Sequence, residues 1–446
     1  VVTDALMVDE DGVSPIDGLN EDGIEWTNEY FSMFRMKQLP ERDHVRISHK
    51  GAAESHGKYD EELVPMGSRF VFELEYDVEG MDSNWDELQK VVERPMFRLG
   101  AGTRKGFGGF KVLASERKDY DFSKKDNIIA YRDKSSKIEK IDANIIDEQK
   151  KYSLKGWTEI SIPLRAESFF LFGSGIGDEH TDMNPKKEFV LDWSNGKPEK
   201  KEKYLIPASS IKGALSHRVA YHYNLIQRDF LLQENTTRID LPELDIEKAI
   251  LEIERKIKVD TKGWMSDSPR WKEIIQQLDT VDIEQLILES SSYKKWLIDM
   301  EEAAKESAKE DKCTGEYNAA VKALFGFAKD DGTEEKTGAR GDVIFQDIYM
   351  SKDDVNTKIL DHIAIDRFTG GTIDGALYQE KVLQFKEGKF IELNLWVKDK
   401  VIENSKIKSA LNAALKDLQT GYLQLGGNVM KGNGVFLKVN EEMVQI

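Results

Sequence analysis

Residues 423–439 read LQLGGNVMKGNGVFLKV, and residues 97–112 read FRLGAGTRKGFGGFKV. Each stretch runs from a Leu-Gly pair through a short variable segment to Lys-Gly-x-Gly, and then to apolar residues of strand character. The matching positions are Gly100, Lys105, Gly106 and Gly108 in the earlier stretch and Gly426, Lys431, Gly432 and Gly434 in the later one. Similarity in register at these positions predicts a duplicated fold.

Both stretches have the composition of phosphate-binding loops. Glycines let a backbone adopt φ > 0 and approach a partner closely, and the exposed N–H groups of such a turn attract phosphate when a cation lies nearby. A hairpin turn with a solvated lysine is the alternative for either stretch alone. Because the pattern occurs twice, we favour anion binding. The candidate residues are Gly100, Arg104, Lys105 and Gly106 in the first loop and Gly426, Gly427, Lys431 and Gly432 in the second.

The repeat extends upstream of each loop. In both copies a histidine (His44, His362) begins an alternating apolar run, which leads through a glycine-rich segment to a tyrosine (Tyr59, Tyr378). A polar turn and a strand-like segment then follow. The sequence therefore predicts two related hairpins, each followed by its glycine loop.

The start of the chain also has a counterpart. VVTDALMVDED (1–11) resembles VIFQDIYMSKDD (343–354), with Asp4 opposite Asp347. The first copy thus begins inside what is the C-terminal half of the second. Strands without partners would leave open sheet edges, so we expect either a longer natural polypeptide or a subunit that completes the first fold. A compact small domain that needs no completion is the alternative.

The composition of the chain limits the classes of protein to which it can belong. The chain has 446 residues, of which 39% are hydrophobic and 33% charged, as expected for two to three globular domains. No apolar run approaches the ~20 residues that span a bilayer, and no signal peptide is recognisable. A single cysteine, Cys313, excludes an internal disulfide framework and a Cys/His zinc cluster. We expect a cytoplasmic protein with no membrane partner.

The net charge of −18 argues against a simple nucleic-acid-binding protein. Basic residues nevertheless gather in two places, around the first glycine loop (98–118) and at 186–212. The acidic residues are concentrated elsewhere, which leaves room for a basic track on an acidic body.

The domain boundaries follow from the repeat. Residues 1–112 are the C-terminal half of a first domain, 113–155 a charged linker, and 156–446 the second domain. Within the second domain, residues 225–312 carry apolar residues at three- and four-residue spacing and none of the repeat's motifs, so we predict a helical insertion that packs or docks a neighbouring subunit. Residues 330–342 read as a flexible exposed loop.

One string is distinctive enough to suggest a family. YLIPASSIKGALSHRVAYHYN (204–224) resembles the IPgSSlKGalR signature of the RAMP superfamily, the backbone RNA-binding subunits of type III CRISPR effector complexes. IDRFTGGTIDGALYQEKVL (365–383) resembles that family's thumb hairpin, ALFGFA (323–328) its mid-chain segment, and both glycine loops its C-terminal loop. The resemblance covers 157–446 apart from the insertion, and 1–112 more weakly. It implies an α+β fold of tandem RRM-like (ferredoxin-like βαββαβ) domains, with a helical insertion in the second.

The resemblance implies RNA contacts at Ser209, Ser210, Lys212 and Arg218. The residues support this independently, because Ser209 and Ser210 can cap a helix beginning at Ile211. The N–H groups of a helix N-terminus attract phosphate, and Lys212 adds a charge nearby. A solvated Lys212 in the first helical turn is the alternative.

The resemblance to the thumb implies that Phe368 is a wedge between bases, with Arg367 on backbone phosphate and Thr369 beside them. An apolar wedge lowers the cost of unstacking because it fills the space that it opens. The alternative is a hairpin packed on its own domain. The corresponding tip of the first copy, SHKGAAESHG (48–57), lacks Phe and Arg and is less suited to this role.

Backbone subunits of the family cleave target RNA with an aspartate in the loop before the SSxKG helix. Here that loop, FGSGIGDEHTDMNP (172–185), offers Asp182 first and Asp178 second, with Glu179 and His180 nearby. A carboxylate there could bind Mg²⁺ or Mn²⁺, with Asp182 as the metal ligand, or align the ribose 2′-OH for in-line attack. A merely solvated acidic loop is the alternative.

Three functions are consistent with the sequence. The first is a backbone subunit that binds guide RNA, contacts other CRISPR effector subunits and cleaves complementary target RNA through Asp182. The second is a non-catalytic assembly subunit that only shapes the guide RNA and bridges its neighbours. The third is a stand-alone endoribonuclease centred on a histidine, for which His180, His217 and His222 are available without a convincing acid–base pair.

Overall fold

The computed structural model describes residues 1–16, 29–35, 38–47, 53–77, 84–93, 97–135, 155–175, 177–227, 315–329, 337–439 and 443–446. The chain divides into two compact units, one formed by Val1–Tyr223 with Ala320–Ile446 and the other by Asn224–Ala319. Nearly all of the predicted helical insertion, 225–312, lies outside the described residues. Among the helices that are described, none has the length and apolar character needed to cross a membrane.

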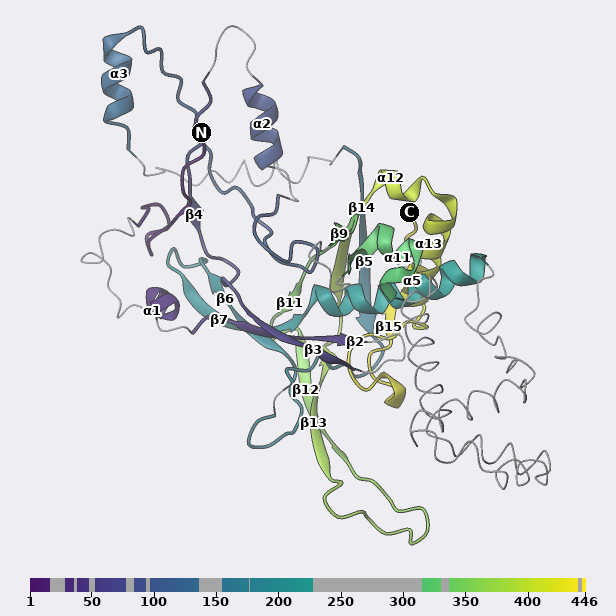
Figure 1. Cartoon of the computed structure of the whole chain (residues 1–446). Helices are drawn as coiled ribbons and strands as arrows, with labels where there is room; N and C mark the ends of the chain where they lie inside the picture. The colour runs from purple at the N-terminus through teal and green to yellow at the C-terminus, as the bar shows by residue number, and fades with distance from the viewer. Residues whose placement is uncertain are drawn as a thin grey trace, which may run out of the picture. The chain divides into compact units, whose positions relative to one another are not determined.

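A four-stranded antiparallel sheet lies at the centre of the larger unit (Figure 1). Its strands are, in spatial order, β10 (Val343–Phe345), β14 (Ile391–Lys398), β5 (Trp157–Ala166) and β15 (Phe436–Lys438). Alternate residues of β5 are buried, as one strand face against a core requires: Ile160, Ile162, Leu164 and Ala166. The register places Leu393 of β14 opposite Ile162 and Phe436 of β15 opposite Ala166.

Two helices supply the other side of this core. α5 (Ala208–Gln227) lies between β5 and β10 in the chain, and α13 (Ser405–Gln419) links β14 to β15. Asn404 begins α13, because its side chain accepts the backbone N–H groups of Lys406 and Ile407. The buried apolar residues of α13 recur at helical spacing: Ile407, Ala410, Leu411, Ala414, Leu415 and Leu418. Along the chain, the sheet and its helices therefore follow as strand, helix, strand, strand, helix, strand.

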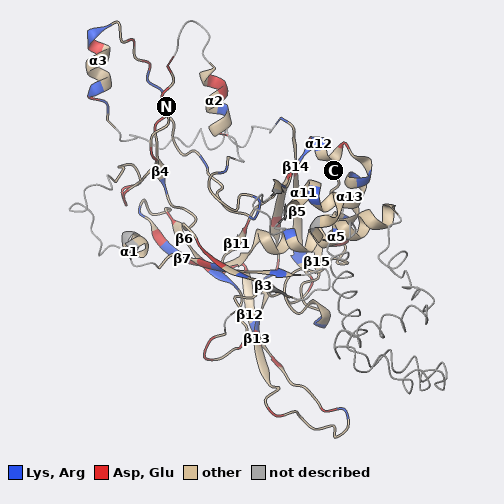
Figure 2. Cartoon of the chain, in the orientation of Figure 1, with Lys and Arg blue, Asp and Glu red and all other residues tan. Residues whose placement is uncertain are grey.

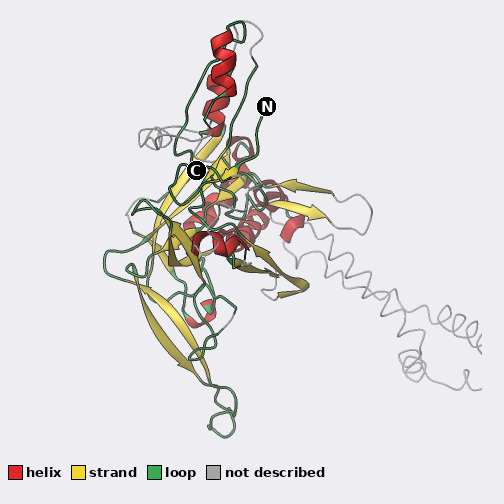
Figure 3. Ribbon diagram, turned by 90° about the vertical axis from the view of Figure 1, so that its left-hand side faces the viewer, coloured by secondary structure: helices red, strands yellow, loops and turns green. Residues whose placement is uncertain are grey.

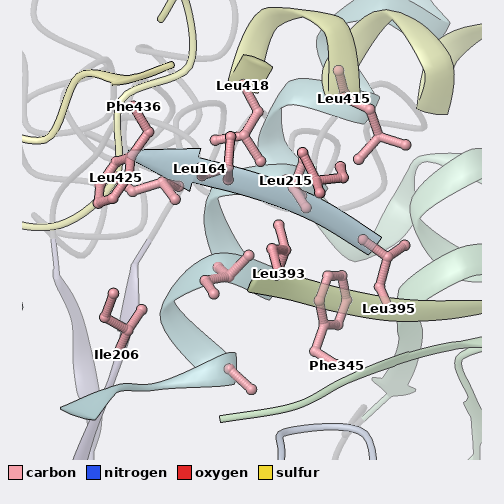
Figure 4. Close-up of a cluster of buried hydrophobic side chains, with 14 of the residues drawn as sticks. Leu164, Ile206, Leu215, Phe345, Leu393, Leu395, Leu415, Leu418, Leu425 and Phe436 are labelled. Carbon is pink, nitrogen blue, oxygen red and sulfur yellow. The ribbon is translucent and has the colours of Figure 1, made fainter. Parts of the chain in front are cut away.

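The core is continuous between sheet and helices (Figure 4). Leu215 from α5 and Leu418 from α13 meet Leu164, Leu393 and Phe436 from the sheet, and all five are fully buried. Burying a side chain of this size contributes roughly 1.5–3 kcal/mol. This core holds the loops at the strand ends in fixed positions.

Smaller sheets surround the centre. β6 (Lys187–Asp192), β7 (Glu199–Ile206) and β11 (Ile348–Met350) form a three-stranded antiparallel sheet in the order β11-β7-β6. β12 (Val355–His362) and β13 (Tyr378–Phe385) pair along their whole length and project as a hairpin with a long tip loop (Figures 1 and 3).

Short elements complete the second copy. α11 (Ala319–Phe325) precedes β8 (Gly326–Lys329), and α12 (Asp399–Ile402) precedes α13. The turns η2 (Gly315–Tyr317) and η3 (Val429–Lys431) are 3₁₀ helices. The predicted flexible loop 330–342 is wrong for Thr337–Arg340, which form strand β9 paired with β8. Pairing with β8 makes this segment a strand, and the local sequence gives no sign of that pairing.

The first copy is built from short strand pairs. β1 (Leu6–Met7) pairs with β4 (Phe70–Val71), and β2 (Glu41–Ile47) pairs with β3 (Ala53–Glu62). Its helices are α1 (Glu29–Arg35), α2 (Trp85–Val92) and α3 (Lys125–Arg132). α3 lies within the predicted linker 113–155, of which the structure describes residues 113–135 and 155.

The first copy is packed onto the second. Tyr30 and Met33 of α1 are buried against Leu191 of β6. The combination of antiparallel sheets with packed helices confirms the predicted α+β class.

Candidate nucleic-acid interface

The two glycine loops have the same backbone path. The N–H of Leu425 donates to the carbonyl of Gly434 at 2.9 Å, and the N–H of Leu99 donates to that of Gly108 at 3.0 Å. The glycines that match in sequence also match in φ: Gly100 and Gly426 (+84°, +95°), Gly106 and Gly432 (+106°, +91°), Gly108 and Gly434 (+68°, +74°). The predicted repeat is therefore a structural repeat at this point.

The glycines in each loop serve different purposes. A Cβ on Gly434 would lie 1.9 Å from the carbonyl oxygen of Leu425, and one on Gly108 would lie 1.9 Å from that of Leu99. These two positions close the turn. By contrast, a Cβ on Gly432 would meet no atom within 4 Å, so its backbone is open to an external partner.

The glycine loop of the second copy is fastened to the hairpin. Glu380 of β13 is fully buried, and its carboxylate accepts a hydrogen bond from the side-chain amide of Asn428 in the loop. Its other oxygen lies 2.7 Å from Nε2 of His362 on β12. Asn428 has a left-handed φ of 55°, a conformation that is uncommon for residues other than glycine. A buried carboxylate requires such partners, and here they fix the glycine loop against the hairpin strands close to where the tip loop begins.

The tip of the β12–β13 hairpin presents apolar side chains to solvent. Phe368 is 98% exposed, and Ile365 and Leu377 are each 61% exposed. Asp366 organises the tip, because its carboxylate accepts the backbone N–H groups of Phe368 and Thr369 at 2.9 and 2.7 Å. Arg367 and Thr369 are exposed beside Phe368. The alternative of a hairpin packed on its own domain is excluded for these side chains, whereas the corresponding tip of the first copy (48–52) lies outside the described residues.

The acidic loop is tied to the same hairpin, at the end of β13 that is next to the tip loop. The backbone N–H groups of Asp182 and Met183 donate to the carbonyl of Gln379 at 2.9 and 3.2 Å. The N–H of Gln379 donates in return to Oδ2 of Asp182 at 2.7 Å. Asp182 is exposed at this position, although Gln379 already binds one of its carboxylate oxygens.

Asp178 has a different environment from Asp182. Its Oδ1 accepts the backbone N–H groups of His180 and Thr181 and the hydroxyl of Thr181, at 2.8–2.9 Å. Its Oδ2 lies 3.0 Å from Nζ of Lys381. The hydrogen bond from His180, the ion pair with Lys381 and the bonds from Thr181 hold the pKa of Asp178 well below its ordinary value. Asp178 therefore stabilises the loop, and Asp182 is the better placed carboxylate for an external ligand.

A divalent ion at this loop would depend on donors from outside the chain. Within the described ranges, no group of three or more His, Cys, Asp or Glu side chains is placed to hold a metal. Mg²⁺ commonly binds through one or two carboxylates together with substrate phosphates and water. The single carboxylate of Asp182 fits that mode and does not fit an all-protein cage.

The start of α5 differs from the prediction. The helix begins at Ala208, not at Ile211, and its first N–H donates to Oδ1 of Asp347 at 2.8 Å. The cap is thus a distant carboxylate, and Ser209 and Ser210 lie inside the first turn, half-buried and exposed respectively. A carboxylate at this N-terminus opposes a phosphate there, so the helix start is a weaker anion site than its sequence indicates.

One other predicted contact residue, Arg218, already has a protein partner. Arg218 donates from Nε to Asp417 of α13 at 2.5 Å, and Nε2 of His222 lies 2.6 Å from the same carboxylate oxygen. RNA at Arg218 would compete with this interhelical contact. Lys212 is half-buried and is the fifth residue of α5, just past its first turn.

The first glycine loop is partly used for packing. Arg104 donates to the carbonyl of Gly341 at 2.8 Å, and a Cβ on Gly106 would lie 2.5 Å from Asp347 and 2.7 Å from Ala208. Gly100, in contrast, would meet no atom within 4 Å. Acidic and basic residues are interspersed along β6 and β7 (Figure 2). Among the basic residues at 186–212, Lys187 pairs with Glu202, Lys197 with Glu10 and Lys201 with Asp192.

Three segments distant in sequence therefore meet at residues 378–381: the acidic loop with Asp182, the start of β13 itself, and the glycine loop through Asn428. An open glycine backbone with exposed lysine and aromatic side chains suits a single strand of nucleic acid, whereas the exposed carboxylate would need a bridging cation beside a phosphate. The sequence did not identify Gln379, Glu380 or Lys381 as part of this site. Their proximity to Asp182 arises from strand pairing, for which the local sequence carries no signal.

Comparison with known proteins places this geometry in context. The sequence model of the RAMP superfamily matches residues 19–111 and 164–436, in both copies of the repeat. No curated protein sequence matches the chain. Among solved structures, the chain is similar to one described as "CRISPR RNA-guided surveillance complex, pre-nicking", at 12% identity and a TM-score of 0.29, over 63% of this chain and 74% of that one. The family match, which spans most of the chain, is the informative result.

Proposed function

This chain belongs to the RAMP superfamily, and on that basis we propose that it is a guide-RNA-binding backbone subunit of a type III CRISPR ribonucleoprotein. In this proposal two RRM-like domains in tandem bind one RNA, the partners are guide RNA, target RNA and other effector subunits, and the protein acts in the cytoplasm. The two matched regions and the duplicated glycine loops support the tandem arrangement.

The observation that carries the proposal is the meeting of three segments at residues 378–381, where the paired strands of the β12–β13 hairpin end and its tip loop begins. A wedge residue, Phe368, is almost fully exposed in that tip loop. Asp182 is held beside the start of β13 by Gln379. One hairpin therefore links a base-separating tip to a carboxylate, and a strand following the hairpin would pass both.

We propose that target RNA is cleaved where Asp182 meets its backbone. Asp182 would hold Mg²⁺ or Mn²⁺ together with phosphate oxygens, and such an ion neutralises charge at a scissile phosphate. The chain's own residues position the strand: Gln379 fixes the Asp182 carboxylate through its N–H, and Phe368 displaces a base so that the ribose–phosphate linkage can turn. Proper alignment of a 2′-OH with the phosphate accounts for a large part of the rate of such reactions.

The test is cleavage of a guide-matched RNA by the complex reconstituted around Asp182→Asn and Glu179→Gln variants. We expect Asp182→Asn to lower the single-turnover rate by about 10²-fold or more, with RNA affinity unchanged. Glu179→Gln, at an exposed acidic residue of the same loop, is the matched control and should retain activity. Full activity of Asp182→Asn would contradict the catalytic assignment.

A non-catalytic assembly role is the second candidate. It is favoured by the hydrogen bond from Gln379, which already occupies one oxygen of Asp182. In that case the reconstituted complex binds guide RNA and its cleavage rate is insensitive to Asp182→Asn and to the choice of divalent ion.

A further inference from the structure

The lysine of each glycine loop lies over a tyrosine of the preceding hairpin. Nζ of Lys431 is 4.5 Å from the ring centre of Tyr378, and Nζ of Lys105 is 4.8 Å from that of Tyr59. These distances are those of a cation–π contact. Lys105 also donates a hydrogen bond to the Tyr59 hydroxyl.

A histidine stacks on each tyrosine. The rings of His362 and Tyr378 are 4.7 Å apart at an interplanar angle of 19°, and those of His44 and Tyr59 are 5.0 Å apart at 17°. In both hairpins the two rings face each other directly across the strands, where side chains interact most strongly. The sequence repeat aligns His44 with His362 and Tyr59 with Tyr378, and in the structure each His–Tyr pair is stacked.

A glutamate completes each group, two residues after the tyrosine and thus on the same strand face. An oxygen of Glu380 lies 2.7 Å from Nε2 of His362, and an oxygen of Glu61 lies 3.2 Å from Nε2 of His44. Glu380 also binds the glycine loop through Asn428. Each group of four side chains, here called a quartet, therefore joins two strands of a hairpin to the loop that carries the lysine. The quartets are Lys431, Tyr378, His362 and Glu380 in the second copy, and Lys105, Tyr59, His44 and Glu61 in the first.

We infer that each quartet is one contact point for a nucleic-acid phosphate, with the lysine ammonium as the contacting group and the other three as positioning residues. The inference rests on the proposed function and assigns positioning roles to His362, Tyr378 and Glu380, and to His44, Tyr59 and Glu61. Its consequence is that the first copy binds RNA at one point comparable to that of the second, even though its hairpin tip lacks Phe and Arg.

The physical reason for such an arrangement is preorganisation. A free lysine loses much rotamer freedom when it binds a phosphate, whereas one already held over an aromatic ring loses less. Beside Lys431, Gly432 leaves room for a nucleic-acid backbone, because a Cβ there would meet no atom within 4 Å, whereas Gly106 beside Lys105 lies against Asp347 and Ala208. Lys431 is exposed. The Lys105 side chain is 35% exposed, and its Nζ lies 3.9 Å from Oε1 of Glu61, so a phosphate there would share the ammonium with this carboxylate.

The test is the salt dependence of binding of the full chain to fluorescein-labelled oligouridine. Neutralising one phosphate contributes about 0.7 to the slope of log K against log salt for a single strand. We expect Lys431→Ala and Lys105→Ala each to reduce the slope by about 0.7, and the double variant by about 1.4. Lys389→Ala, an exposed lysine paired with Asp354, is the matched control and should leave the slope unchanged.

The positioning role is tested at Tyr378. Tyr378→Phe keeps the ring and should bind as the wild type does, whereas Tyr378→Leu should weaken binding about two- to fivefold with an unchanged thermal unfolding midpoint. Equal affinity of the Phe and Leu variants would overturn this role. An unchanged slope in either lysine variant would overturn the claim of two contact points. Absence of any RNA binding by the wild type would instead overturn the proposed function itself.

Discussion

Nη1 of Arg42 lies 2.7 Å from Oδ2 of Asp347, and the two side chains are 4% and 8% exposed. Arg42 comes from the hairpin of the first copy, and Asp347 caps α5 of the second. The same guanidinium makes a two-point contact with Glu188 at 2.7 and 3.0 Å. Burial raises the pKa of Asp347. Burial acts to lower the pKa of Arg42, but its partners Glu188 and Asp347 outweigh that effect and hold the pKa of Arg42 above its ordinary value. One buried cation thus joins the two copies of the repeat.

Replacing Arg42 with Ala should destabilise the chain by roughly 3–5 kcal/mol, because two buried carboxylates lose their counter-charge. The measurement is the urea unfolding midpoint followed by tryptophan fluorescence. Lys58→Ala removes an exposed ion pair with Asp43 on the same hairpin and should change the free energy of unfolding by less than about 1 kcal/mol. Equal midpoints for the two variants would show that Arg42 does not join the copies.

Stability should fall as the pH falls through about 6.5, in part through His44. Burial lowers the pKa of His44, and the positive charges of Lys105 and Arg42 act in the same direction, while Glu61 and Asp347 partly oppose them. A histidine with a lowered folded-state pKa binds protons more readily when unfolded, so its contribution is present above its ordinary pKa and lost below it. His44→Gln should therefore show a smaller loss of unfolding midpoint between about pH 7.5 and about pH 5.5 than the wild type. An equal loss in both proteins would contradict the assignment.

Gly434→Ala should destabilise the second glycine loop far more than Gly432→Ala. Both residues have positive φ, and the left-handed conformation alone costs an alanine about 1–2 kcal/mol. Only at Gly434 would the new Cβ also collide with the Leu425 carbonyl, at 1.9 Å. Chemical denaturation of the two variants checks this difference, and similar midpoints would mean that the turn relaxes around the added methyl group.

Phe368→Ala should separate RNA binding from folding. The side chain is 98% exposed, so the free energy of unfolding should change by less than about 0.5 kcal/mol. Loss of a base-contacting aromatic should weaken binding to a guide–target duplex by about 1–3 kcal/mol, as measured by fluorescence anisotropy. Phe390→Ala, at a partly exposed aromatic outside the hairpin tip, provides the control. Unchanged affinity of Phe368→Ala would remove the wedge from the proposal.

The local sequence was sufficient for features that depend on backbone conformation and period. Glycine at positions 100, 106 and 108 and at 426, 432 and 434 predicted two matching loops, because few other residues adopt their φ angles without strain. The three- and four-residue spacing in α13 and the alternation in β5 follow from burial of one face. The family resemblance rested on the same kind of local pattern and is confirmed by the family match.

The local sequence was misleading where the bonding partner of a group is a residue far away in the chain, and not a neighbour. Ser209 and Ser210 have the character of helix caps, yet α5 begins before them because Asp347, 139 positions away, accepts the first N–H. Arg104 and Gly106 were predicted to contact RNA, and they lie against Gly341 and Asp347 of the other copy. No local pattern encodes such a partner, because it is brought close only when the two copies pack.

The sequence by itself therefore determined the duplication, the turns and the helices, since these depend on residues a few positions apart. Only the tertiary structure decided which carboxylate is free to meet a ligand, Asp182 or Asp178, because Lys381 and Gln379 reach them through strand pairing about 200 positions later in the chain. Long-range pairing creates environments that local spacing does not specify. The charge and accessibility of the site are properties of those environments.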